Sequence, residues 1–209
     1  MKGCFITLEG PEAGGKSTQV SRLKELLEAK GIRYTITREP GGTRIGDRLR
    51  EILLDPDSKL ASKTEILLYA ASRAQLVDEV IRPALARGEV VICDRYVDSS
   101  ISYQAYGAVE DVDEVSQINK IATSGLLPDR TYLLDLPVEI TQQRLLKRGS
   151  SPDRIEQRSL LYHQRVRQGY LTLARLEPDR IMIVDATQTE QDVFSMIKRD
   201  FLRLLSKLE

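Results

Sequence analysis

The stretch that decides the fold is Gly10–Ser17, which reads Gly-Pro-Glu-Ala-Gly-Gly-Lys-Ser and follows the apolar run Cys4–Leu8. It matches the pattern G-x-x-x-x-G-K-[S/T], in which a glycine-rich turn joins a buried strand to a helix. An amphipathic pattern over 16–30 supplies that helix, and Gly31 follows at the expected stop position. Because both flanking elements are present, we interpret this stretch as a phosphate-binding loop rather than as an ordinary glycine-rich turn.

The side chains and backbone of this loop suit a nucleoside triphosphate. Gly14 and Gly15 let backbone N–H groups point inward, where they and the helix N-terminus surround phosphate oxygens. Lys16 neutralises the β- and γ-phosphates, and Ser17 offers a hydroxyl to Mg²⁺. We predict that ATP contacts Gly10, Pro11, Glu12, Ala13, Gly14, Gly15, Lys16, Ser17 and Thr18.

Beyond the loop, short apolar runs alternate with amphipathic helical patterns. Further strands are predicted at 34–37, 90–93, 132–134 and 181–184. Helices are predicted at 43–54, 62–87, 97–106, 111–124, 138–147, 154–176 and 189–208. This order predicts an α/β fold with a five-stranded parallel sheet covered by helices on both faces, with ligands at the carboxyl ends of the strands. No linker or repeat interrupts the order, so residues 1–209 are expected to form one domain.

Composition excludes several classes of protein. The chain has 31 Lys+Arg and 31 Asp+Glu residues, so it has no net charge that would attract a nucleic-acid polymer or an acidic membrane. The longest apolar run is Ile66–Ala71, far short of the roughly 20 residues that cross a bilayer, and no signal peptide is recognised. Cys4 and Cys93 lie in apolar stretches, which suits free thiols in a reducing compartment. We expect a cytoplasmic protein that binds small anions.

Arginines that follow the strands indicate a second anion site. Asp94 and Arg95 come directly after the run 90–93, which places them at the same sheet edge as the phosphate loop. Asp94 there can hold Mg²⁺, directly or through water, or accept a proton. The guanidinium fork of Arg95 suits phosphate, although a surface ion pair is the more common role of a single arginine. Three further arginines strengthen the interpretation: Arg38, Arg50 and Arg73.

Other side chains suit a nucleotide base. Tyr69 and Arg73 are four residues apart and therefore share a helical face, where a ring can stack on a base. Core packing explains Tyr69 equally well. Gln104 both donates and accepts, which matches a pyrimidine edge with adjacent carbonyl and N–H groups, although glutamine is also an ordinary helix-surface residue.

The segment 147–154 reads as a basic lid. Gly149, two serines and Pro152 make it a flexible loop, and Arg148 and Arg154 near its ends could close over transferred phosphate. The alternative is a solvated turn. We favour the lid because the loop separates two helices that follow a strand ending at the phosphate-loop side.

In combination, these motifs resemble the thymidylate kinase family over nearly the whole chain. The residues that carry the resemblance are Gly10–Ser17, Arg38–Thr43 (REPGGT), Tyr69 with Arg73, Asp94–Tyr96 (DRY) and Ser99–Gln104. The resemblance implies a three-layer P-loop nucleoside monophosphate kinase fold. It also implies transfer of the ATP γ-phosphate to dTMP with Mg²⁺, in a homodimer.

The same resemblance implies roles for individual residues. Arg50, Arg73 and Arg95 belong to the acceptor phosphate, and Tyr69 to stacking on thymine. Ser100 and Gln104 belong to the thymine edge, Tyr103 to the position of a ribose 2′-hydroxyl, and Glu12 to the sugar 3′-hydroxyl. The complete expected dTMP set is Glu12, Arg38, Arg50, Tyr69, Arg73, Arg95, Ser100, Tyr103 and Gln104.

One departure from the family pattern concerns the catalytic cation. Some members carry an arginine in the phosphate loop where this chain has Ala13, so the cation is expected from the lid, as in bacterial members. Ser17 and Asp94 are the expected metal-site residues. The expected catalytic set is Lys16, Asp94, Arg95, Arg148 and Arg154.

Two other functions stay open at this point. A kinase for another nucleoside or nucleotide would share the loop and the Asp94–Arg95 motif, and Tyr103 and Gln104 argue against it. A non-catalytic ATP-binding switch would share the loop alone, and it would leave the acceptor-site arginines without a ligand.

Overall fold

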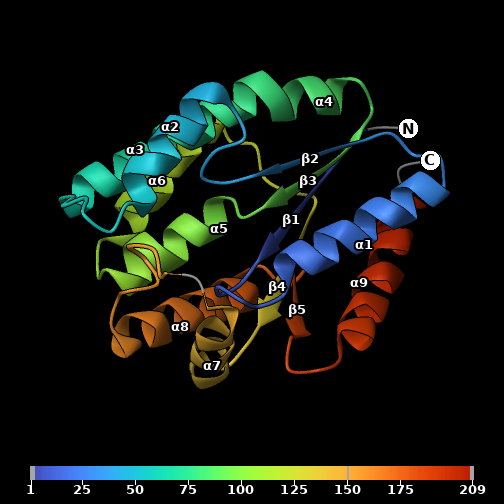
Figure 1. The fold of residues 1–209 in the computed structure, drawn as a ribbon. Coiled ribbons are helices and arrows are strands. Elements are labelled where there is room, and N and C mark those ends of the chain that lie inside the picture. Colours follow the sequence, from blue (N-terminus) through green and yellow to red (C-terminus); the bar gives the residue numbers. More distant parts are fainter. Residues whose placement is uncertain (1–2, 150, 208–209) are drawn as a thin grey trace.

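A computed structural model describes residues 3–149 and 151–207, and its centre is one parallel sheet (Figure 1). Within these residues the strands are β1 (Cys4–Glu9), β2 (Tyr34–Arg38), β3 (Val90–Asp94), β4 (Arg130–Asp135) and β5 (Ile181–Asp185). Their order across the sheet is β2-β3-β1-β4-β5, so β1 is central. The predicted α/β fold with a five-stranded parallel sheet is confirmed.

The strands are apolar on both sides because helices cover both faces of the sheet. Cys4, Ile6 and Leu8 of β1 pack with α1 (Lys16–Ala29) and α9 (Glu190–Leu205), which lie side by side in Figure 1. Phe5 of the same strand faces the other way, into a cluster with Leu76 and neighbouring apolar residues. The alternation along β1 therefore builds two cores from one strand.

The opposite face is covered in two parts (Figure 1). Near β2 and β3 lie α2 (Arg44–Leu54), α3 (Ser62–Leu76), α4 (Arg82–Ala86), α5 (Val97–Ser100) and α6 (Val112–Thr123). Near β4 and β5 lies α8 (Leu160–Leu176), which also contacts α7 (Val138–Arg148).

The predicted helix 62–87 is continuous but changes its winding near Pro83. A π-helical turn, Val77–Ile81, separates α3 from α4, and Arg82 N–H bonds to the Val77 carbonyl. Proline has no N–H to donate to the carbonyl four residues earlier, so the regular α-helical bonding is interrupted there and the chain adopts a wider, π-helical turn.

The predicted helix 97–106 also becomes π-helical, over Ile101–Gly107. The wider turn rotates the chain less per residue than an α-helix does. Ser102, Tyr103, Gln104 and Ala105 are all buried, so neighbouring elements cover this segment on more than one side.

The predicted helix 154–176 begins later than expected, at Leu160. Ser159 caps it by accepting a hydrogen bond from the Tyr162 N–H (3.3 Å). Upstream, the Asp153 carboxylate accepts from the N–H groups of Ile155 and Glu156 (both 2.9 Å), which winds a separate turn. At the other end of the chain, α9 stops at Leu205, and Leu208 of the predicted 189–208 lies outside the described residues.

The sheet order determines where a ligand can bind. The segments that follow β1, β2 and β3 all emerge at one edge, because these strands are parallel neighbours. Separately, no helix among the described residues is both long and apolar enough to cross a membrane.

The packing of the core predicts that Phe201→Ala strongly destabilises the protein. Phe201 is fully buried beneath the sheet, so its removal should lower the free energy of unfolding by about 3–5 kcal/mol. Phe194→Ala on the same helix is the matched control, because Phe194 is only partly buried and should cost about 1–2 kcal/mol. Urea denaturation measures both changes, and equal losses would contradict this account of the core.

Candidate active site

A cavity of about 480 Å³ opens at the carboxyl edge of the sheet. Most of the predicted residues line it: Glu12, Ala13, Gly14, Gly15, Lys16, Ser17, Thr18, Arg38, Arg50, Tyr69, Arg73, Asp94, Arg95, Ser100, Tyr103, Gln104 and Arg148. Gly10, Pro11 and Arg154 are not among its lining residues. The phosphate loop, the acceptor arginines and the predicted base-binding side chains thus share one cavity.

Gly10 and Pro11 support the loop from behind. Gly10 has a φ of +127°, and a Cβ there would lie 2.3 Å from the Leu134 carbonyl oxygen, so only glycine fits. The Lys16 ammonium donates to the carbonyls of Gly10 (3.1 Å) and Pro11 (2.7 Å). These bonds hold the lysine across the mouth of its own loop.

Lys16 is buried among charges of both signs. Burial is the main cause that lowers its pKa to about 8, and the nearby Arg95 lowers it further. Asp94, Glu12 and Glu9 oppose the shift. A phosphate in the loop would add negative charge and favour the protonated lysine.

Glu12 and Arg95 link the phosphate loop to the end of β3. Arg95 Nη2 lies 3.0 Å from Glu12 Oε1, and the Tyr103 hydroxyl donates to the same oxygen (2.7 Å). The Arg95 guanidinium also stacks over the Tyr103 ring, 5.0 Å from its centroid. Burial would raise the pKa of Glu12, but Arg95, Lys16 and this hydroxyl outweigh burial and lower it.

The second oxygen of Glu12 is available for a ligand. Glu12 Oε2 is buried, and no group of the described residues gives it a hydrogen bond. A buried carboxylate oxygen needs a donor. The predicted contact with a sugar hydroxyl would supply one.

Arg95 adopts a left-handed backbone conformation, with a φ of +72°. Its side chain donates to Ser99 Oγ (3.2 Å) and to the Tyr170 hydroxyl (3.1 Å). A non-glycine residue in this conformation is a feature typical of functional sites.

Glu9, Ser99 and Tyr170 were not predicted as site residues. Glu9 ends β1, and its carboxylate accepts from the Ser99 hydroxyl (2.6 Å) and the Tyr170 hydroxyl (2.9 Å). Burial and the nearby Asp98 raise its pKa to about 7, against the opposing effect of Arg95. A glutamate directly before a phosphate loop in an otherwise apolar strand is the signal that could have identified it.

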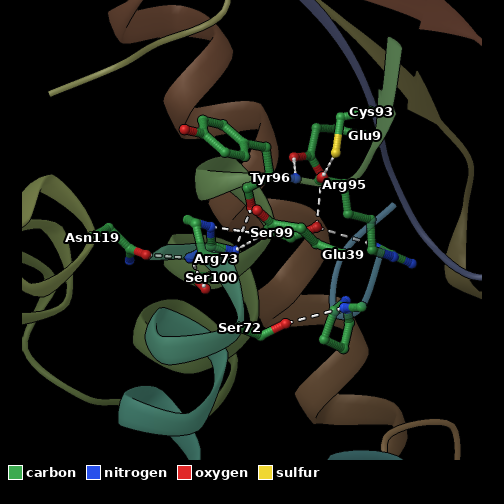
Figure 2. A network of polar contacts seen from close by, with 12 residues as sticks. Glu9, Glu39, Ser72, Arg73, Cys93, Arg95, Tyr96, Ser99, Ser100 and Asn119 are labelled. Carbon is green, nitrogen blue, oxygen red and sulfur yellow. Dashed lines mark hydrogen bonds and ion pairs between the residues drawn. The ribbon is translucent and has the colours of Figure 1, made fainter. Parts of the chain in front are cut away.

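Arg73 lines the cavity, but its side chain is fully engaged by the protein (Figure 2). Nε donates to Glu39 (2.7 Å), and Nη1 donates to Ser100 (2.9 Å) and to Asn119. Nη2 donates to the Tyr96 carbonyl (3.1 Å) and pairs with Glu39. All five N–H groups are used, so the predicted contact with phosphate requires one of them to change partner.

Glu39 is the second carboxylate that the sequence interpretation overlooked. It lies in the RE of the segment Arg38–Thr43, at the end of β2, and only 4% of it is exposed. Burial would lower the pKa of Arg73, but Glu39 outweighs this and raises it. Glu39 therefore keeps the buried guanidinium of Arg73 charged beside the cavity.

Arg38, Arg50 and Tyr69 also line the cavity. Arg50 Nη1 donates to the Pro40 carbonyl (2.9 Å), and burial, with Arg38 nearby, lowers its pKa. Both effects favour an anion beside Arg50. Tyr69 is half-buried, so its ring can serve both core packing and stacking.

Asp94 has an oxygen suited to a metal ion. Its Oδ1 is buried, and none of the described residues donates a hydrogen bond to it. Ser17 lines the same cavity. A carboxylate and a hydroxyl are ligand types that Mg²⁺ accepts, so the residues present fit this ion.

The two lid arginines occupy different environments. Arg148 lines the cavity, and its Nη2 lies 2.8 Å from both carboxylate oxygens of Glu156. Arg154 is buried away from the cavity lining, where Nη1 binds Glu65 (2.6 Å) and Nε binds the Leu53 carbonyl (2.7 Å). The sequence left open which of the two arginines reaches the phosphates; in this structure Arg148 lines the cavity, whereas a buried carboxylate holds the Arg154 guanidinium outside its lining. Ser150, inside the predicted lid 147–154, lies outside the described residues.

Comparison with known proteins identifies the family. The family model for thymidylate kinase matches residues 8–197. The chain belongs to the thymidylate kinase family.

Individual relatives agree with this assignment. A thymidylate kinase from Exiguobacterium sibiricum is 51% identical over 210 residues, covering 100% of this chain and 99% of the relative. One from Deinococcus radiodurans is 53% identical over 192 residues, covering 92% and 93%. The crystal structure of thymidylate kinase from Ehrlichia chaffeensis superposes with a TM-score of 0.77 at 28% identity, covering 96% of this chain and 99% of that one. The predicted resemblance and the nucleoside monophosphate kinase fold are confirmed.

The low pKa of Lys16 predicts that ATP binding takes up a proton in mildly basic solution. Because the free lysine loses its charge as pH rises through about 8, ATP must re-protonate it, and affinity should fall above that pH. Calorimetric titrations at pH about 8.5 in two buffers of different ionisation enthalpy measure the uptake, which should vanish at pH about 6.5. Lys16→Arg keeps the charge without titrating here, so it is the control. Equal uptake in both proteins would contradict the prediction.

Proposed function

We propose that this protein transfers the γ-phosphate of ATP to dTMP, producing ADP and dTDP. One observation supports this most directly: the phosphate loop and the set of side chains suited to a pyrimidine monophosphate line the same cavity. Membership of the thymidylate kinase family points to the same reaction. A non-catalytic ATP switch would not need the second half of this cavity.

The chemistry requires positioning and positive charge rather than a covalent intermediate. An oxygen of the acceptor phosphate attacks the γ-phosphorus, and the bond from that phosphorus to the β–γ bridging oxygen breaks as ADP leaves. Lys16, Arg95 and Arg148 surround the region where charge spreads over the transferred group. No nucleophilic side chain takes part.

Mg²⁺ is the proposed cofactor. Ser17 and the unpartnered Oδ1 of Asp94 would hold it, directly or through water. When bound, the ion would neutralise charge on the β- and γ-phosphates.

The acceptor would bind in the other half of the cavity. Arg50 and Arg95 suit its phosphate, with Arg38 beside them, while Tyr69 can stack on the thymine ring and Gln104 can meet the ring edge. The Tyr103 hydroxyl, held on Glu12, fills space near the sugar and would disfavour a ribose 2′-hydroxyl. These contacts favour a deoxypyrimidine over other acceptors.

We also propose that the whole chain acts as one domain with a lid over 147–154. The ion pair of Arg148 with Glu156 would keep the lid cation at the cavity when the loop closes. An arginine that reaches the phosphates on closure would restore the charge missing at Ala13.

A cytoplasmic homodimer is the proposed form of the enzyme. Leu67 on α3 and Ile121 on α6 are 56% and 79% exposed on helices that pack together, and a second copy could cover them. Cys4 and Cys93 are buried free thiols, in keeping with a reducing compartment.

The proposal predicts that ADP release depends on the acceptor. A coupled assay across dTMP, dUMP, dCMP, dGMP and the ribonucleotide of thymine should give the highest kcat/KM with dTMP. The assay without acceptor is the control for simple ATP hydrolysis. Equal rates with and without dTMP would contradict the proposed function.

A second prediction concerns the lid. Arg148→Ala should lower kcat by about 10³-fold or more if this arginine stabilises the transferred phosphoryl group, with the dTMP KM almost unchanged. Arg175→Ala is the control, because Arg175 is an exposed arginine outside the cavity lining that donates a hydrogen bond to Thr172 on the same helix, α8. Steady-state kinetics separate kcat from KM, and an unchanged kcat would remove Arg148 from catalysis.

A further inference from the structure

Glu65 connects the lid to the side chain expected to meet the base. It lies on α3 and is only 3% exposed. Gln104 Nε2 donates to Glu65 Oε1 (3.0 Å), and Arg154 Nη1 donates to Glu65 Oε2 (2.6 Å). Gln104 and Arg154 are themselves buried, so these two bonds are shielded from water.

The carboxylate determines which way the Gln104 amide faces. An ionised carboxylate only accepts hydrogen bonds, so the amide must turn its NH₂ group toward Glu65. The carbonyl Oε1 and the second N–H then remain for the cavity that Gln104 lines. Within the described residues, no group donates to this Oε1.

Arg154 fixes the carboxylate in turn. A guanidinium only donates, and its Nε is anchored on the Leu53 carbonyl (2.7 Å). Arg158 approaches the same Glu65 oxygen at 3.5 Å from the protein surface. Arg154 and Gln104 therefore both donate to Glu65, and the carbonyl of the Gln104 amide is left as an acceptor.

We infer that Glu65, held by Arg154, orients the Gln104 amide so that the site selects pyrimidines with a 4-oxo group and an N3–H over 4-amino pyrimidines. This inference rests on the proposed function, and it adds a positioning residue to the acceptor site. Arg154 takes part through Glu65 rather than through the transferred phosphate.

The two kinds of pyrimidine present opposite hydrogen-bonding patterns. Thymine and uracil offer an N3–H donor beside an O4 acceptor, which match Oε1 and the free N–H of Gln104. Cytosine offers an N3 acceptor beside an N4–H donor. The carbonyl of the same amide would then face the N3 acceptor, and its N–H would face the N4–H donor. A buried polar site rejects a ligand that leaves its groups unpaired.

Glu65→Gln should reverse this preference. Arg154 can only donate, so it retains the amide oxygen of the substituted side chain and directs the new NH₂ group at Gln104. Gln104 must then turn its own carbonyl toward that NH₂, and its N–H groups face the base. The substitution preserves shape and removes one negative charge.

The test compares kcat/KM for dTMP, dUMP and dCMP in the wild type and in Glu65→Gln. The values for dTMP and dUMP should both fall by about 10-fold to 100-fold, and the dTMP to dCMP ratio should fall by at least as much. The KM for ATP should not change. Glu79→Gln is the matched control, because Glu79 accepts from Gln75 Nε2 (2.8 Å) in an exposed Glu–Gln pair further along the same helical segment; its ratio should equal the wild-type ratio.

Two further variants separate orientation from general damage. Glu65→Asp keeps an acceptor-only carboxylate and should retain the preference for dTMP. Arg154→Met should weaken the preference by a smaller factor than Glu65→Gln, because Glu65 still accepts from Gln104 but is no longer held by Arg154. This variant keeps the inference testable if Glu65→Gln does not fold.

Some outcomes would overturn the inference. They are an unchanged dTMP to dCMP ratio in a folded Glu65→Gln protein, equal losses for all three acceptors, or an unchanged ratio in a folded Arg154→Met protein. Wild-type activity is a separate result: a wild type that does not phosphorylate dTMP would refute the proposed function instead.

Discussion

The ion pair between Arg95 and Glu12 is the interaction on which the site depends. It joins the segment after β3 to the loop after β1, at adjacent strands of the sheet. Glu12 also accepts a hydrogen bond from the Tyr103 hydroxyl, and the Arg95 guanidinium lies over the Tyr103 ring. Because both charges are largely buried, removing either partner would leave the other without compensation. One pair thus fixes the phosphate loop relative to the acceptor half of the cavity.

This pair is one of several that together explain the neutral composition. The chain gathers cations at one sheet edge for its anionic ligands, and three of the arginines named above pair with carboxylates: Arg95 with Glu12, Arg73 with Glu39, and Arg154 with Glu65. The balance of 31 basic and 31 acidic residues is therefore partly a property of the site itself. Carboxylates with a free oxygen, as at Glu12 and Asp94, are where a ligand or metal ion completes the set.

Sequence reasoning located the elements well because their signals are local. The strands are short apolar runs, and the phosphate loop is a continuous pattern between two recognisable elements. The errors have local physical causes too. Pro83 induces a π-helical turn that no apolar periodicity reveals, and the Ser159 cap starts α8 six residues later than its amphipathic pattern suggested. The arginines of the site were predicted from the sequence. Their partners lie on other strands and helices, so the sequence could not show which arginines are held by the protein and which can bind a ligand.

The arginines differ in how many of their N–H groups donate hydrogen bonds to the protein, which the sequence does not show. Arg73 donates all of its N–H groups to Glu39, Ser100, Asn119 and a backbone carbonyl. It therefore holds β2, α3 and α6 together around the cavity. Arg154 donates hydrogen bonds to Glu65 and to the Leu53 carbonyl near the end of α2. Arg73, whose N–H groups are all used by protein acceptors, shapes the site although it lines the cavity, whereas Arg154 Nη2 has no hydrogen-bond partner among the described residues. The same residue type thus divides between architecture and chemistry according to how many of its N–H groups protein acceptors use.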